Sequence, residues 1–270
     1  MAADEIEKNE NLSLKLDFNF NSRRIDTRTR MRVVFGLFSK KDEPSLAFVC
    51  GCGVGVECKA FRDRGVSVVG LDVNREAIRV ANSNMPGGFF VIGSATHLPF
   101  KDGSYSRIVC SAVLEHIRDD KRAILEMERT LMDGKELVIT VPRRRHSRSD
   151  VRFLQEVEEK FGHVREGYTV EDIKSLLRGG KLTVVKFKLY WGPLHWLMLG
   201  LFERMPVATK GSVASAISTN EAKDVKRILR ARALDMIILF LTVVSHIDSV
   251  VPFPSSHRFG MGVLMRKIRA

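Results

Sequence analysis

Short apolar runs alternate with amphipathic stretches through the middle of the chain, from Ser45 onward. Runs typical of strands lie at 46–50, 67–71, 89–92, 106–111, 135–141 and 182–190. Helical patterns lie between them, at 54–64, 74–82, 119–132 and 169–178. Strands that alternate with helices are typical of a parallel sheet with helices on both faces. The pattern therefore predicts an α/β fold built on a doubly wound sheet.

The two ends of the chain depart from this pattern. In residues 1–44, a polar segment leads into the arginine-rich RRIDTRTRMR and the apolar VVFGLF, which together predict a helix ahead of the first strand. Residues 191–257 hold two apolar pieces, 191–202 and 236–247, on either side of a basic stretch that starts with a capping box at Ser218 and Glu221. We therefore expect four parts: a leading segment 1–44, a core 45–190, a helical apolar insertion 191–257 and a final core strand 258–270.

The net charge and the apolar insertion indicate which class of partner the protein binds. The chain has 270 residues and a formal net charge of +12, which favours an anionic partner but does not choose among nucleic acid, phospholipid headgroups and a phosphorylated small molecule. Both apolar pieces are shorter than the roughly 20 residues that span a bilayer. Trp191 and Trp196 beside a basic stretch favour contact with an anionic membrane surface. The alternatives are burial in the domain and a lid over an apolar substrate.

The four cysteines, at 50, 52, 58 and 110, have neither the spacing of a zinc site nor that of a disulfide framework. We interpret them as reduced thiols of a cytosolic-type compartment and predict no metal site. The first ten residues are acidic and polar, which is not the pattern of a signal peptide. The expected location is cytoplasmic, at the membrane face if the insertion contacts lipid.

The stretch LAFVCGCGVG, residues 46–55, ends an apolar strand in closely spaced glycines. Glycines at 51, 53 and 55 allow a ligand to approach the backbone, and the helix that follows offers free N–H groups. Asp72 ends the next strand, and an acid there can accept both hydrogen bonds of a ribose diol. This pair fits either a dinucleotide or an adenosyl cofactor. The dinucleotide pattern requires glycine at position 56, where this chain has valine.

Five segments in order extend this site: GCGVG, GLDVN, GSATHLPF, LEHI, and ELVITVPR followed by GHVREGYT. In these segments the chain resembles class I S-adenosylmethionine-dependent methyltransferases, in particular the small-molecule branch typified by quinone-biosynthesis enzymes. The resemblance covers residues 46–190, and the final strand adds to it. It implies a Rossmann-like sheet of seven strands with an antiparallel last strand, and S-adenosylmethionine as the cofactor.

The resemblance also implies roles for matching positions. The glycines would pack against the methionine part of the cofactor, Asp72 would hold the ribose, Val73 would flank the adenine, and the Ala95 N–H would meet the adenine ring. The full set of implied cofactor contacts is Gly51, Cys52, Gly53, Gly55, Asp72, Val73, Ser94, Ala95, Leu98, Cys110 and Ser111.

This chain departs from the family at three positions where an aspartate is usual, namely Val49, Ser94 and Ser106. Ser94 still accepts a hydrogen bond, and the loss of a neutral hydrogen bond is worth about 0.5–1.5 kcal/mol. Loss of a charged contact at Val49 is worth about 1.5–3 kcal/mol unless another carboxylate compensates. We therefore expect an intact loop and a weakened cofactor site.

Methyl transfer from a sulfonium is an in-line displacement, for which an enzyme chiefly aligns the reacting atoms. His116 in LEHI is the candidate catalytic residue, as a base or as a group that orients the substrate. The alternative is that it caps the next helix or packs on the cofactor. His163, Arg165 and Tyr168 are the candidate substrate contacts; alternatively, Arg165 pairs with a carboxylate and Tyr168 packs. Thr169 is the predicted N-cap of the following helix.

The sequence as a whole favours a methyltransferase acting on a hydrophobic or phosphorylated small molecule, such as a lipid, a quinone or a lipid-linked intermediate. The alternative is a binding protein that keeps the fold without catalysis, because acids are missing from the cofactor site. A nucleic-acid methyltransferase is less favoured, since the chain lacks the Asn/Asp-Pro-Pro-aromatic tetrad of amino-directed DNA enzymes. A nicotinamide dehydrogenase is disfavoured by the missing glycine.

Overall fold

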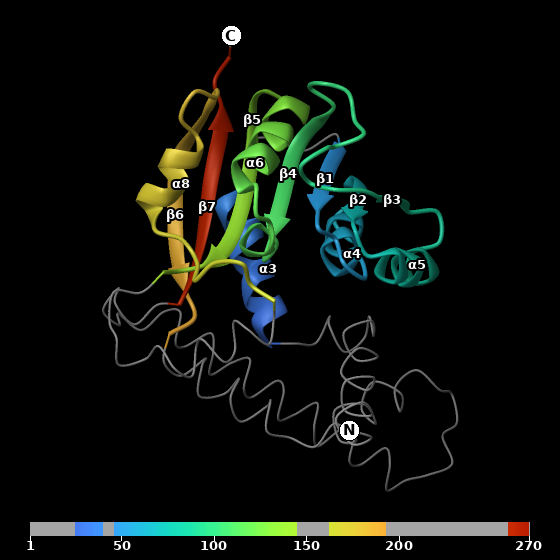
Figure 1. Ribbon diagram of the computed structural model, residues 1–270. Coiled ribbons are helices and arrows are strands. Elements are labelled where there is room, and N and C mark those ends of the chain that lie inside the picture. Colours follow the sequence, from blue (N-terminus) through green and yellow to red (C-terminus); the bar gives the residue numbers. More distant parts are fainter. Residues whose placement is uncertain (1–24, 40–45, 145–161, 193–258, 270) are drawn as a thin grey trace, which may run out of the picture.

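A single sheet organises the part of the chain that the computed structural model describes, residues 25–39, 46–144, 162–192 and 259–269 (Figure 1). Its strand order is β3-β2-β1-β4-β5-β7-β6. The strands are β1 (Leu46–Cys50), β2 (Ser67–Asp72), β3 (Phe89–Ile92), β4 (Tyr105–Ser111), β5 (Leu131–Pro142), β6 (Leu182–Tyr190) and β7 (Gly260–Lys267). Neighbours from β3 to β5 are parallel, whereas β7 is antiparallel to β5 and β6. The predicted seven-stranded sheet with an antiparallel last strand is confirmed.

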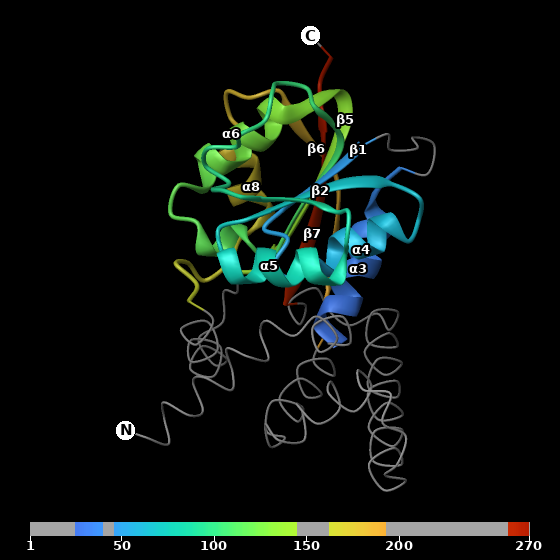
Figure 2. The same cartoon turned by 90° about the vertical axis from the view of Figure 1, so that its right-hand side faces the viewer.

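Helices pack against both faces of this sheet. They are α3 (Ile25–Leu37), α4 (Val56–Arg62), α5 (Arg75–Asn84), α6 (Asp120–Thr130) and α8 (Val170–Leu176), with the short 3-10 helix η1 (Leu114–His116). Helices α6 and α8 cover one face, and α3 and α4 cover the other (Figure 2). In β1, Phe48 and Cys50 join the first core and Ala47 and Val49 join the second. An unbroken apolar run is what a strand covered on both faces requires, because successive side chains point to opposite faces.

The leading helix α3 packs closely on the last strand. A Cβ at Gly262 in β7 would lie 2.6 Å from Val33 Cγ1 and 2.9 Å from Leu37 Cδ1. These distances are shorter than van der Waals contact, so glycine is what permits this approach. The first described helix and the last strand of the chain therefore pack directly against each other.

One predicted boundary is wrong by a few residues. The helix expected over 119–132 ends at Thr130, and the strand expected from 135 begins at Leu131. Leu131 has an extended backbone, with φ −80 and ψ 136, and it pairs with Tyr105 ahead of a register shift in the β4–β5 ladder. A strand that starts directly at a helix end has no polar turn to mark it, which is why the pattern placed the boundary too late.

The predicted insertion lies outside the described residues apart from positions 191 and 192, and so does the polar segment up to residue 24. The four-part division of the chain therefore stays a prediction. Among the helices that are described, none has the length and apolar character needed to cross a membrane.

Candidate active site

A cavity of ≈ 640 Å³ opens at the carboxyl ends of β1, β2 and β4. The strand order reverses between β1 and β4, and open α/β sheets bind ligands at such a switch point. Eight of the predicted cofactor contacts line the cavity: Gly51, Cys52, Gly53, Asp72, Val73, Ser94, Ala95 and Ser111. The candidate catalytic residue His116 lines it as well.

The glycine loop has the backbone that a close ligand approach requires. Gly51 and Gly53 have φ values of 71 and 51, in the left-handed region that side chains other than glycine rarely adopt. A Cβ at Gly51 would also lie 2.9 Å from Val113 Cγ1, so the cavity wall leaves no room for a larger residue there. The loop is thus shaped both by its dihedral angles and by the segment that follows β4.

Asp72 holds this loop to the end of β2. Its Oδ2 accepts a hydrogen bond of 2.8 Å from the Gly53 N–H, and its Oδ1 accepts one of 2.9 Å from the Asn74 N–H. The backbone N–H groups of Gly51 and Cys52 donate to the Leu71 carbonyl at 2.7 and 2.9 Å. A carboxylate has about four acceptor sites, so Asp72 keeps capacity for two hydroxyl groups. Asp72 therefore holds the glycine loop in place and keeps acceptor sites free for a ligand.

Three implied cofactor contacts lie behind the cavity wall instead of lining it. Cys110 is fully buried in β4, and Leu98 belongs to the same core cluster. Gly55, the N-cap of α4, is closed in by the Ala81 Cβ, which would be 3.2 Å from an added Cβ. These residues support the wall. The sequence did not distinguish such support from contact, because Gly55 and Leu98 sit inside recognised segments and Cys110 sits between two of them.

The cysteines of this region remain thiols. All four cysteines of the chain are buried and free of disulfides, as their spacing predicts. A hydrogen bond with Cys58 and burial raise the pKa of the Cys52 thiol well above its ordinary value. Cys52 therefore contributes a small neutral side chain to the cavity.

Three charged residues that the sequence did not single out line the same cavity: Arg118, Glu57 in the first turn of α4, and Arg30 in α3. Glu57 Oε1 lies 4.0 Å from Arg30 Nη2, and Arg30 Nη1 lies 3.2 Å from Asp26 Oδ2. Burial raises the pKa of Glu57, and the charge of Arg30 acts in the opposite direction. The Arg30 Nε–H is buried without a hydrogen-bond partner. An acid directly after the glycine loop was the available sequence signal for Glu57.

The three positions that lack the usual aspartate have different surroundings. The side chain of Val49 is 1% exposed and packs in the second core. Ser106 lies at the start of β4, away from the cavity, where its hydroxyl donates to the Leu46 carbonyl at 2.9 Å. Ser94 lines the cavity, and its hydroxyl lies 2.8 Å from that of Thr96. Of the three substitutions, those at Val49 and Ser94 are the ones that bear on the cavity or its loop.

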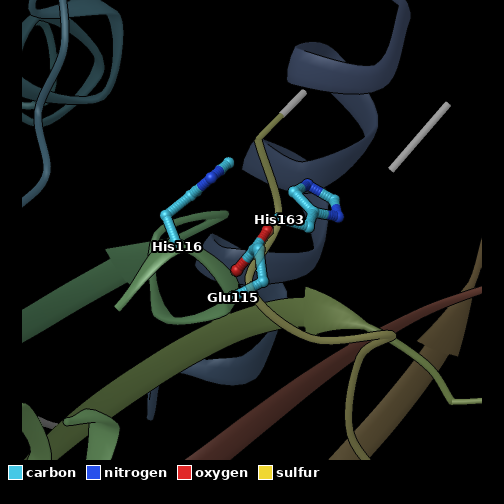
Figure 3. A group of neighbouring side chains, drawn as sticks. All are labelled: Glu115, His116 and His163. Atoms are coloured by element: carbon cyan, nitrogen blue, oxygen red, sulfur yellow. The ribbon is translucent and has the colours of Figure 1, made fainter. Parts of the chain in front are cut away.

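His116 lies beside Glu115 and His163 at one side of the cavity (Figure 3). The rings of His116 and His163 have centroids 4.8 Å apart, and His116 Nδ1 lies 3.2 Å from the Gly162 carbonyl oxygen. Burial raises the pKa of Glu115 to about 7. Burial, with the charge of His116, lowers the pKa of His163 to about 4. His116 does not cap the next helix, because Asp119 is the N-cap of α6 and accepts from the Arg122 N–H.

The other candidate substrate contacts are used within the fold. Arg165 Nη1 lies 2.7 Å from Asp120 Oδ2, and its Nη2 donates to the carbonyls of Ile117 and Arg118. Tyr168 is 1% exposed, and its hydroxyl lies 3.0 Å from both the Leu114 carbonyl and Asp120 Oδ2. Neither side chain, nor that of His163, lines the cavity. Arg165 and Tyr168 thus fasten the segment before α8 to η1 and to the start of α6, as expected if Arg165 pairs with a carboxylate and Tyr168 packs.

The predicted cap of α8 is present. Thr169 accepts a hydrogen bond from the Asp172 N–H at 3.1 Å, and Asp172 Oδ2 accepts one from the Thr169 N–H at 2.7 Å, which completes a capping box. An arginine-rich run, PRRRHSRSD (142–150), follows β5. Its described part ends at Arg144, which lies 3.3 Å from Asp172 Oδ2. The rest of that run, 145–150, lies outside the described residues.

Comparison with known proteins agrees with this geometry. Residues 48–139 match the methyltransferase domain family. A demethylmenaquinone methyltransferase from Renibacterium salmoninarum is 33% identical over 87 residues, which cover 32% of this chain and 37% of that protein. The matched segment therefore spans little more than a third of the relative's length.

Two solved structures share the fold at low identity. The first is phosphoethanolamine N-methyltransferase 2 of Haemonchus contortus, in complex with phosphomonomethylethanolamine and S-adenosylhomocysteine, with TM-score 0.56, 12% identity and coverage of 90% of this chain and 53% of that one. The second is the cyclase SpnF, with TM-score 0.53, 16% identity and coverage of 92% and 82%. Over residues 48–139 the chain thus matches the methyltransferase domain family, and its described residues share the fold of these two structures.

Proposed function

We propose that this protein binds S-adenosylmethionine and transfers its methyl group to a small molecule. The observation that carries the proposal is the glycine loop, which is tied to Asp72 and borders a cavity of ≈ 640 Å³ at the switch point of the sheet. The match to the methyltransferase domain family over residues 48–139 supports it. When bound, S-adenosylmethionine supplies an electrophilic methyl group; the residues of the chain bind it and align the acceptor.

The ribose and adenine ends of the cofactor would be held by residues after β2 and β3. Asp72 has acceptor capacity left for the ribose hydroxyls beyond its bonds to Gly53 and Asn74. The side chain of Val73 is 70% exposed at the cavity, which offers an apolar surface for one face of the adenine. Ser94 and Ala95 line the same end, with a hydroxyl and a backbone N–H for the ring edge.

The amino-acid end of the cofactor would be recognised by Glu57 and Arg30. A carboxylate and a guanidinium suit the ammonium and the carboxylate of a zwitterionic amino acid, because each pair forms charge-assisted hydrogen bonds. Both side chains line the cavity at the glycine loop, and the Arg30 Nε–H lacks a partner there. Glu57 would thereby replace the acid that is missing at Val49. The loss of cofactor affinity expected from the missing acid at Val49, before the loop, is then compensated by Glu57, after the loop.

The methyl acceptor would enter the cavity near His116, Ile117 and Arg118, which are among its lining residues. His116 can take a proton from an acceptor that must lose one, or can hold the acceptor in line with the methyl group. Arg118 brings a positive charge to this end, which suits a phosphorylated or otherwise anionic substrate. The name of the Renibacterium salmoninarum relative adds a quinone to the candidates.

A lipid-like substrate and contact with the cytoplasmic face of a membrane are part of the same proposal. Their support is the net charge of +12 and the apolar pieces at 191–202 and 236–247. Co-sedimentation with anionic liposomes tests them, with neutral liposomes as the control. Pelleting only with anionic vesicles is the expected result, and a protein that stays in the supernatant with both would exclude this part of the proposal.

Calorimetric titration of the full chain with S-adenosylmethionine and S-adenosylhomocysteine tests the cofactor. We expect micromolar binding of both, and loss of at least about tenfold in affinity in the variant Asp72→Asn, since a charged hydrogen bond is worth about 1.5–3 kcal/mol. Absence of binding at millimolar ligand would favour the second candidate, a non-catalytic binding protein. The missing acids at Val49 and Ser94 are the observation behind that candidate.

A further inference from the structure

Three potential metal ligands meet beside the cavity, although they come from different parts of the chain. One ligand atom from each of Glu115, His116 and His163 lies within 4.8 Å of the others. Glu115 and His116 belong to η1, whereas His163 lies in the segment before α8. The Val164 N–H donates to the Glu115 carbonyl at 2.9 Å, which holds the two segments together. Figure 3 shows the Glu115 carboxylate extending toward the two imidazole rings.

One oxygen of the buried Glu115 carboxylate lacks a hydrogen-bond partner. The residue is 1% exposed, and its Oε2 is buried without a hydrogen bond. Removal of a carboxylate from water is costly unless a cation or a hydrogen-bond donor replaces the water. Glu115 therefore requires either a bound proton or a bound cation at this place.

The imidazole of His116 is oriented as metal ligands commonly are. Its Nδ1 lies 3.2 Å from the Gly162 carbonyl oxygen. A carbonyl only accepts, so in this contact Nδ1 carries the proton, and Nε2 of the neutral ring keeps its lone pair. Metal-binding histidines usually donate their other ring N–H to a carbonyl or a carboxylate in this manner.

We propose that Glu115, His116 and His163 bind one divalent transition-metal ion, with Zn²⁺ as the best match. Two imidazoles and one carboxylate are a donor set that Zn²⁺ favours, and three protein ligands leave one position open for a small molecule. Because His116 lines the cavity, that open position would face it. This site is separate from the four cysteines, whose spacing was the basis for predicting no metal.

The size of the group is compatible with such an ion after a small adjustment. Bonds of about 2.0–2.2 Å to a tetrahedral Zn²⁺ place the ligand atoms roughly 3.4 Å from one another. The three atoms, which lie within 4.8 Å, would move together by up to about 1.4 Å. His116 is exposed, so rotation of its side chain can supply this movement.

An ion at this position would hold an oxygen of the substrate, such as a phosphate oxygen or a hydroxyl, next to the proposed methyl donor. A coordinated hydroxyl ionises more readily, which favours substrates with a hydroxyl at the reacting end. This consequence rests on the proposed methyl transfer, whereas the metal site itself does not.

Titration of chelator-treated full-length protein with Zn²⁺ tests the site, without S-adenosylmethionine present. We expect binding of Zn²⁺ by the wild type with a dissociation constant near or below micromolar, and a loss of at least about tenfold in both Glu115→Gln and His163→Gln. His97→Gln is the control, because it removes an exposed imidazole that does not line the cavity. The control variant should bind as the wild type does.

Wild-type protein that binds no Zn²⁺ would overturn the proposal, and so would equal binding by the wild type and His163→Gln, which would locate the ion elsewhere on the chain. The visible spectrum of the Co²⁺-loaded wild type gives a second readout. Its band should change in His163→Gln and persist in His97→Gln. Thermal unfolding of each metal-free variant checks the fold, and if Glu115→Gln does not fold, the half-buried His163 decides the question. A positive result here and a negative cofactor titration, or the reverse, separates the two proposals.

Discussion

Replacement of Glu57 by glutamine tests how the cofactor site works without an acid at Val49. Glutamine keeps the shape of the side chain and removes its charge. Glu57 is 8% exposed at the cavity, 4.0 Å from Arg30 Nη2, so the change acts where water screens charges weakly. Arg30 keeps its ion pair with Asp26 at 3.2 Å, and we expect the variant to fold.

The expected loss follows from the charge of the partner. A hydrogen bond between a carboxylate and the cofactor ammonium is worth about 1.5–3 kcal/mol. At 1.4 kcal/mol for each factor of ten, Glu57→Gln should weaken S-adenosylmethionine binding roughly tenfold to 150-fold. Methylthioadenosine lacks the amino-acid end of the cofactor, so its affinity should be nearly unchanged.

Calorimetry with both ligands on the wild type and the variant measures this difference. Glu76→Gln is the matched control, because Glu76 is an exposed acid in the first turn of α5 that does not line the cavity. If Glu57→Gln weakened both ligands equally, Glu57 would act through the loop and not through the ammonium. Unchanged binding of S-adenosylmethionine would refute the compensation altogether.

Two further predictions concern the supports of the site. Tyr168→Phe should lower the free energy of unfolding by about 1–3 kcal/mol, because the Leu114 carbonyl and Asp120 Oδ2 lose a buried hydroxyl. Chemical denaturation measures this loss. A drop in cofactor affinity without a loss of stability would instead support a role for Tyr168 in ligand binding. Hydrogen bonds from Arg129 lower the pKa of Glu126 below 4.5, so its stabilising contribution is present above that pH and is lost as the pH falls through the lowered pKa. The free energy of unfolding, measured from neutral pH down to about pH 3, should therefore fall less steeply in Glu126→Gln than in the wild type. If both proteins lost stability equally toward low pH, Glu126 would not contribute in this way.

Much of the core was predictable because its elements have local causes. An unbroken apolar run such as that of β1 requires helices on both faces, and it marked a strand without knowledge of its neighbours. The loop after it was predictable because only glycine adopts the φ of Gly51 readily. Thr169 and Asp172 marked the start of α8 in the same way, since a capping box needs only residues three apart.

The candidate site was predictable in part, and its missing members are those brought in by distant contacts. Asp72 follows the glycine loop at a regular distance, so sequence spacing revealed it. Arg30 comes from a helix ahead of β1, and no spacing rule relates that helix to the cavity. Leu98 sits in a recognised segment and Cys110 between two of them, yet both are buried in the core and do not line the cavity.

By itself, then, the sequence determined the order and type of the elements, because hydrophobic period and glycine positions act within one strand or turn. Tertiary structure decided which of these meet. It placed β7 between β5 and β6, with Arg266 on Glu136 at 2.7 Å. It also brought His163 against His116. Such contacts depend on how all the strands are ordered in the sheet. A pattern of polar and apolar positions does not specify which distant residue lies next to a buried charge.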